Sequence, residues 1–98
     1  MQGSEENKFE KYKRIKFYST PEPGKLFTKQ EAEHIYAEAI RRVEWEMGKK
    51  WLNDLNDKEI TKIIIKKSRE VADVYYKRQA QDNLVNKITE LIVRSIRG

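Results

Sequence analysis

Apolar residues in the first half of the chain recur at helical spacing. Their stripe consists of Ala32, Ile35, Tyr36, Ala39, Ile40, Val43, Met47 and Trp51. At 100° per residue these positions cover one broad face of an amphipathic helix. Thr28 and Glu31 have the spacing of a capping box, which indicates a helix start at Thr28. The pattern predicts a helix that ends near residue 54, with Gly48 either tolerated inside it or stopping it early.

A second helix start follows almost immediately. Asn56 and Glu59 repeat the capping-box spacing, and Leu55 and Ile60 occupy the positions of a hydrophobic staple. Apolar residues then continue at helical spacing at Ile60, Ile63, Ile64, Val71, Val74 and Tyr75. Because a connection this short joins neighbouring helices, the sequence predicts an antiparallel helical hairpin.

Polar residues 77–83 interrupt the second stripe. It resumes with Leu84, Val85, Ile88, Leu91, Ile92 and Ile96. One continuous helix over residues 57–97 and two helices that separate near Asp82 both fit this pattern. Two helices are favoured because helices of globular proteins usually span about 8 to 20 residues. We therefore expect an all-α fold: a three-helix bundle built on an antiparallel helical hairpin, with a basic and aromatic N-terminal arm.

The strongest break in the chain is the Thr-Pro-Glu-Pro-Gly sequence at residues 20–24. Its two prolines fix φ, and its glycine suits a tight turn. The predicted organisation is an N-terminal basic arm at residues 1–19, a Pro/Gly linker at residues 20–27 and a helical domain at residues 28–98.

Apolar residues make up only 38% of the 98 residues, and charged residues make up another 38%. This apolar content is low for a globular monomer and fits either slender helices with wide solvated faces or a subunit that completes its core against a partner. We expect a homodimer. The chain lacks cysteine, begins with polar and acidic residues, and has no apolar run near the ~20 residues of a bilayer span. We expect a cytoplasmic protein without a membrane partner.

Catalytic and metal-binding patterns are weak. His34 is the only histidine, and with Glu31 it has the Glu-x-x-His spacing of carboxylate di-metal sites. Such sites need two of these motifs and further carboxylates on facing helices. The sequence also lacks a glycine-rich phosphate loop and a set of nucleophile, base and orienting residue. We expect neither an enzyme nor a metal or cofactor site.

The N-terminal arm combines five cations with four aromatic residues between positions 8 and 18. Cations neutralise phosphates, and aromatic rings stack on unpaired bases. The candidate nucleic-acid contacts in the arm are Lys11, Lys13, Arg14 and Lys16. Alternatively Phe9 with Tyr12, or Ile15 with Phe17, attach the arm to the helices while its cations stay solvated.

A second basic strip lies on the following helix, where Lys62, Lys66 and Arg69 share one surface at spacings of four and three. Solvated lysines are common on amphipathic helices, so this pattern fits a phosphate-binding strip or an ordinary exposed face. A helix-turn-helix reader is disfavoured because the helix opens with acidic residues, which phosphates would repel.

Apolar residues outside the main stripes indicate a second contact surface. The candidate protein-interface residues are Trp45, Leu52, Ile65 and Tyr76, and tryptophan and tyrosine are favoured interface anchors. Either other parts of the chain or a partner cover them. With a net charge of +5, the chain is expected to be a non-catalytic protein that binds nucleic acid as an accessory or regulatory factor. The alternative is a protein–protein interaction module, an adaptor or an inhibitor of a larger acidic partner.

Overall fold

The computed structural model of the protein describes residues 9–15, 26–76 and 81–97. These ranges contain no strand, and their helices are α1 (Glu10–Lys13), α2 (Lys29–Met47), α3 (Asp57–Tyr75) and α4 (Gln81–Arg97). The predicted all-α class is confirmed. None of these four described helices is long and apolar enough to cross a membrane.

Both predicted capping boxes are present. The Glu31 amide donates to Thr28 Oγ1 over 3.1 Å, and the Thr28 amide donates to Glu31 Oε1 over 3.0 Å. At the start of α3 the Glu59 amide donates to Asn56 Oδ1 over 2.9 Å, and the Asn56 amide donates to Glu59 Oε1 over 3.1 Å. Each box satisfies two amides that a helix N-terminus otherwise leaves without partners, which explains why both helices begin where the sequence predicts.

Of the two predicted ends of α2, the early stop at Gly48 is the one observed. The helix stops at Met47 because Gly48 adopts a φ of 94°, a conformation that side-chain-bearing residues rarely enter. A Cβ at this position would meet nothing within 4 Å, so the backbone conformation alone favours glycine. The chain then turns, and the Trp51 amide donates to the Gly48 carbonyl over 3.2 Å. Trp51 thereby returns to the core, with 5% of its surface exposed.

The long second stripe is divided between α3 and α4, so the two-helix alternative is confirmed. The break comes slightly before Asp82, since α3 ends at Tyr75 and α4 begins at Gln81. Residues 77–80 between them lie outside the described ranges.

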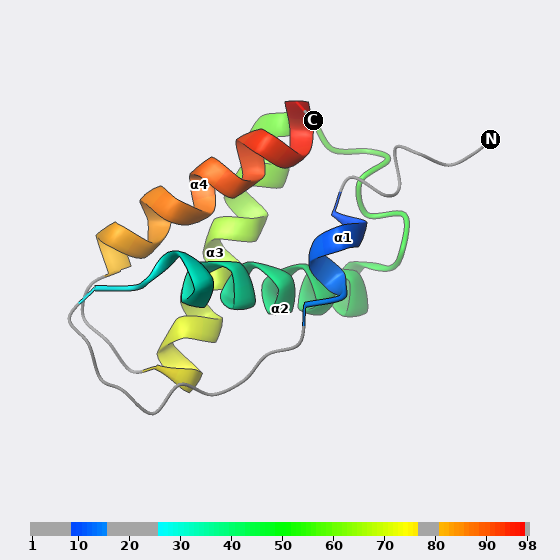
Figure 1. Cartoon of the computed structure of the whole chain (residues 1–98). Helices are drawn as coiled ribbons and strands as arrows, with labels where there is room; N and C mark the ends of the chain where they lie inside the picture. Colours follow the sequence, from blue (N-terminus) through cyan, green and yellow to red (C-terminus); the bar gives the residue numbers. More distant parts are fainter. Residues whose placement is uncertain (1–8, 16–25, 77–80, 98) are drawn as a thin grey trace.

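The long helices are arranged differently from the predicted bundle. Figure 1 shows α3 crossing α2 steeply, so the expected antiparallel packing of these two helices is not confirmed. A short connection brings helix ends together, but the side chains that pack at the crossing set the angle. The oppositely directed neighbours are α3 and α4, because Thr61 near the start of α3 shares a groove with Ile96 at the end of α4.

The core lies where α2, α3 and α4 meet. Its fully buried side chains include Ile35, Tyr36, Ile40, Ile64, Leu84, Ile88 and Ile92. Two polar contacts join α4 to the segment before α2 and to α2 itself: the Phe27 amide donates to Asn83 Oδ1 over 2.8 Å, and the Tyr36 hydroxyl lies 2.9 Å from Ser95 Oγ. Burial raises the pKa of Tyr36 well above its ordinary value, although its hydrogen bond with Ser95 opposes this shift.

Candidate functional site

The described aromatic residues of the N-terminal arm are part of the core. Phe9 stacks on Trp51 with ring centroids 5.9 Å apart and meets Tyr36 edge to face. Tyr12 also meets Tyr36 edge to face, with centroids 4.8 Å apart. Phe9 is 2% exposed and Tyr12 is 7% exposed. These two rings are not available to stack on bases, and the alternative in which Phe9 and Tyr12 attach the arm to the helices is what the structure shows.

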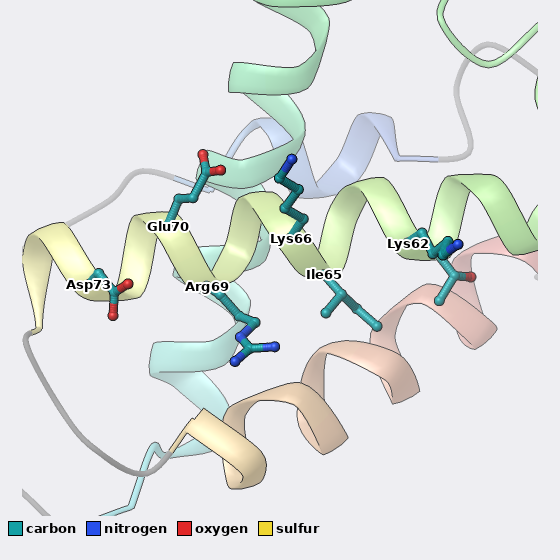
Figure 2. A pocket seen from close by; sticks show the side chains of 7 residues that line it. Lys62, Ile65, Lys66, Arg69, Glu70 and Asp73 are labelled. Carbon is teal, nitrogen blue, oxygen red and sulfur yellow. The ribbon is translucent and has the colours of Figure 1, made fainter.

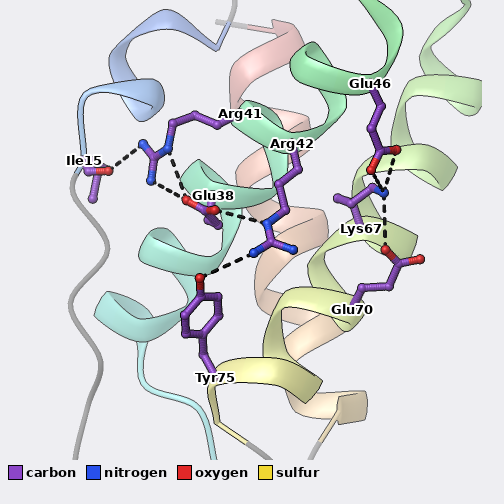
Figure 3. A network of polar contacts seen from close by, with 8 residues as sticks. All are labelled: Ile15, Glu38, Arg41, Arg42, Glu46, Lys67, Glu70 and Tyr75. Carbon is purple, nitrogen blue, oxygen red and sulfur yellow. Dashed lines mark hydrogen bonds and ion pairs between the residues drawn. The ribbon is translucent and has the colours of Figure 1, made fainter.

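Arg41 of α2 fastens the end of α1 (Figure 3). Its Nη1 donates to the carbonyl of Lys13 over 2.7 Å and to the carbonyl of Ile15 over 2.8 Å. Its Nε and Nη2 donate to Glu38 Oε1 over 3.2 Å and 3.0 Å. The last carbonyls of a helix lack partners within the helix, so the guanidinium acts as a cap supplied by another element. Sequence reasoning missed Arg41 because nothing in its local spacing points to a distant carbonyl.

The cations of the arm differ in their surroundings. Lys13 Nζ lies 2.8 Å from Glu44 and 3.1 Å from Glu10. Burial lowers the pKa of Lys13, but hydrogen bonds to these two carboxylates outweigh burial and raise it above its ordinary value. The positive charge of Lys13 is therefore balanced within the fold by these two carboxylates. Lys11 is exposed with its Nζ 5.1 Å from the centroid of the Tyr12 ring, and Arg14 is also exposed.

Lys16, the fourth candidate in the arm, lies outside the described residues. The arm therefore offers two exposed cations within its described part, Lys11 and Arg14, where the sequence suggests four.

The basic strip of α3 is exposed. Lys62, Lys66 and Arg69 line an open groove of about 470 Å³ together with the half-buried Ile65. Figure 2 shows these side chains projecting from one length of α3, with Ile65 and Arg69 directed to the side on which α4 lies. The structure thus brings together the three α3 cations that the sequence singles out.

Carboxylates of α3 also border this groove, namely Glu70 and Asp73. Glu70 lies 3.2 Å from Lys67 Nζ, and Lys67 also binds both carboxylate oxygens of Glu46 of α2 over 2.8 Å (Figure 3). Hydrogen bonding to Glu46 raises the pKa of Lys67 against the effect of burial. Lys67 therefore joins α3 to α2, whereas its neighbour Lys66 is exposed.

The four predicted protein-interface residues do not form one surface. Tyr76 is buried, with its ring edge to face against Phe27 at a centroid distance of 5.5 Å. Leu52 and Ile65 are half-buried and pack against the core. Trp45 is different, because 89% of its surface is exposed. The chain itself therefore covers most of the predicted second apolar surface and leaves Trp45 uncovered.

A polar network lies on α2 beside Trp45. Arg42 Nε donates to Glu38 Oε2 over 3.1 Å, and Arg42 Nη2 donates to the Tyr75 hydroxyl over 3.4 Å (Figure 3). The Arg42 guanidinium also lies 5.8 Å from the centroid of the Tyr75 ring. Hydrogen bonding to Glu38 raises the pKa of Arg42 above its ordinary value. The Glu38 carboxylate therefore binds the guanidiniums of both Arg41 and Arg42.

His34 is half-buried on α2. Across residues 9–15, 26–76 and 81–97, no three histidine, cysteine, aspartate or glutamate side chains come together as metal ligands.

Comparisons of this chain with protein-family models, with curated proteins and with solved structures find no match. We therefore infer the function from the chemistry of the exposed surfaces.

Proposed function

We propose that this protein is a non-catalytic helical protein that binds nucleic acid as an accessory or regulatory factor. The observation that supports this proposal best is the exposed strip of Lys62, Lys66 and Arg69 on α3. Lysine and arginine side chains bind phosphates and release their counterions, which favours association with any nucleic acid.

The length of the strip suits a phosphate backbone. From Lys62 to Arg69 the helix rises about 10 Å, at about 1.5 Å per residue. The phosphates of one strand of a duplex succeed one another at about 3.4 Å along its axis, so the strip spans about three of them. The net charge of +5 adds a general attraction to the polyanion.

The arm has a smaller part in this proposal than the sequence suggests. Lys13 is held by Glu44 and Glu10, and the rings of Phe9 and Tyr12 are buried. Lys11 and Arg14 stay exposed and can add phosphate contacts at the edge of α1. The main contribution to binding is therefore assigned to α3.

The test is a salt titration of oligonucleotide binding, followed by fluorescence anisotropy. Replacing Lys62, Lys66 and Arg69 together by alanine should weaken binding to unrelated sequences. It should also reduce the slope of log affinity against log salt by about 0.9 for each duplex phosphate that is no longer neutralised. The matched control replaces Lys29, Arg94 and Arg97, three exposed cations elsewhere on the described surface, and removes the same charge.

The proposal stands if the control variant keeps most of the affinity that the α3 variant loses. Equal losses in the two variants would show attraction to net charge alone and would remove the assignment to α3. A parent protein that binds no oligonucleotide even at low salt would overturn the proposal. The protein–protein interaction module, an adaptor or inhibitor of an acidic partner, would then take its place.

A further inference from the structure

The two tryptophans of the chain have opposite environments. Trp51 is 5% exposed in the core, whereas Trp45 is 89% exposed near the end of α2. Trp45 follows the fully buried Tyr36 by nine residues, which at 100° per residue places it on the opposite side of the helix from the core. An indole turned outward on a regular, capped helix makes no contribution to the packing of the core.

Two cations lie beside this indole on α2. Arg41 and Arg42 precede Trp45 by about one helical turn, so they lie on the same side of α2 as the indole. Glu38 is shared by both guanidiniums, and the carboxylates that flank Trp45 are paired elsewhere, Glu44 with Lys13 and Glu46 with Lys67. The outer face of α2, defined here as Glu38, Arg41, Arg42 and Trp45, therefore has a net positive charge.

Arg42 is oriented before any ligand arrives. Its contacts with Glu38 and Tyr75 use Nε and Nη2, and 36% of its side chain is exposed. In the described structure its Nη1 makes no hydrogen bond within the protein and can donate to an anion. A guanidinium that is already positioned loses less conformational freedom when it binds a phosphate than a mobile lysine does.

The charge and shape of this face favour one occupant. A second copy of the chain that docked through the same face would bring like charges together, which disfavours a symmetric dimer. A protruding indole needs a matching pocket on a protein partner, but an unpaired base stacks on it without one. Bases of a duplex are already stacked on their neighbours, so an aromatic side chain reaches them only by separating a base step.

We propose that the outer face of α2 stacks an unpaired base on Trp45 and holds an adjoining phosphate through Arg42. The protein then selects single-stranded over double-stranded nucleic acid. This inference rests on the proposed function and adds the class of ligand. The α3 strip supplies phosphate contacts to either class, and Trp45 distinguishes between them.

The experiment uses the intrinsic fluorescence of the two tryptophans. An oligothymidylate of about 12 nucleotides and a mixed-sequence duplex of the same length are titrated into the full chain. The single strand should quench the emission of Trp45, and the duplex should not. In Trp45→Ala the remaining emission of the buried Trp51 should not respond to the single strand. The affinity for the single strand, measured by anisotropy, should fall about 10-fold because one base–aromatic stack is removed.

Two variants keep the test selective. Trp45→Phe retains an aromatic face and should recover most of the lost affinity for the single strand. Val93→Ala removes an exposed apolar side chain of α4, 42% exposed, and should leave the affinity unchanged. Circular dichroism of Trp45→Ala should match the parent, because the side chain lies outside the core.

The possible failures are distinguishable. If the parent binds both oligonucleotides with equal affinity and Trp45→Ala changes neither, the stacking proposal is overturned while phosphate binding by α3 stands. If neither oligonucleotide binds, both proposals fail together. Self-association of the parent that disappears in Trp45→Ala would make this face a dimer interface and would also overturn the stacking proposal.

Discussion

The N-terminal arm and α3 both place cations beside apolar side chains, yet the structure uses them differently. In the arm, the rings of Phe9 and Tyr12 are buried and Lys13 lies between two carboxylates. On α3, Lys66 is exposed, whereas the adjacent Lys67 is bound by Glu46 and Glu70. The difference shows that a cation becomes structural when a neighbouring element presents a carboxylate to it. Composition along the sequence does not distinguish the two cases.

The largest expected effect tests whether the arm belongs to the core. Phe9→Ala should lower the free energy of unfolding by about 3 to 5 kcal/mol, because the ring is buried against Tyr36 and Trp51. Ile65→Ala on α3 should cost less, about 1 to 2 kcal/mol, since that side chain is only half-buried. Urea denaturation of the two variants measures both values. A loss of less than about 1 kcal/mol in the free energy of unfolding for Phe9→Ala would mean that the arm lies at the surface. The contrast with α3 would then be lost.

The next effect concerns the cap of α1. Arg41→Lys keeps the charge but removes the planar group that reaches the carbonyls of Lys13 and Ile15 together. We expect a cost of about 2 kcal/mol in the free energy of unfolding, because hydrogen bonds from a charged donor are removed. Arg42→Lys is the matched control and should cost less than about 0.5 kcal/mol, since its partners are the side chains of Glu38 and Tyr75 and not backbone carbonyls that end a helix. Equal costs for the two variants would mean that Arg41 does not hold the arm.

The smallest effect compares one lysine from each region. Lys13→Ala removes the ion pairs with Glu44 and Glu10 and should cost about 1 kcal/mol, because only 19% of its side chain is exposed. Lys62→Ala should change stability by less than about 0.5 kcal/mol, because that side chain is solvated. Thermal unfolding of both variants at low and high salt checks the difference. A larger cost for Lys62→Ala would indicate that the α3 strip is structural and would weaken its assignment to phosphates.

Features that depend on neighbouring residues are predictable from this sequence, and features that depend on distant residues are not. The capping boxes at Thr28 and Asn56 each involve residues three positions apart, so their spacing is sufficient to identify both helix starts. The same kind of pattern leaves the end of α2 open between Gly48 and residue 54, because the apolar stripe continues to Trp51 after the backbone leaves the helix at Gly48.

The steep crossing of α2 and α3 depends on how side chains of the two helices fit together, which no local pattern encodes. The same holds for the arm. Its aromatic and basic composition fits both a ligand-binding segment and a segment that packs on the helices. The positions of Tyr36, Arg41 and Glu44 in space show that its described part packs on the helices. Tyr76, predicted at an interface, is buried because Phe27, from the segment before α2, lies against its ring.

The brevity of α1 has a consequence for the order in which the protein assembles. A helix of four residues cannot persist alone, since nucleation fixes several dihedral angles for very few hydrogen bonds. Its cap comes from Arg41, 28 residues beyond Lys13, and its stacking surface includes Trp51. We therefore expect α1 to fold late, onto a surface that the longer helices have already built. For the same reason its amides should exchange with solvent through a partial opening that leaves the centre of the protein closed.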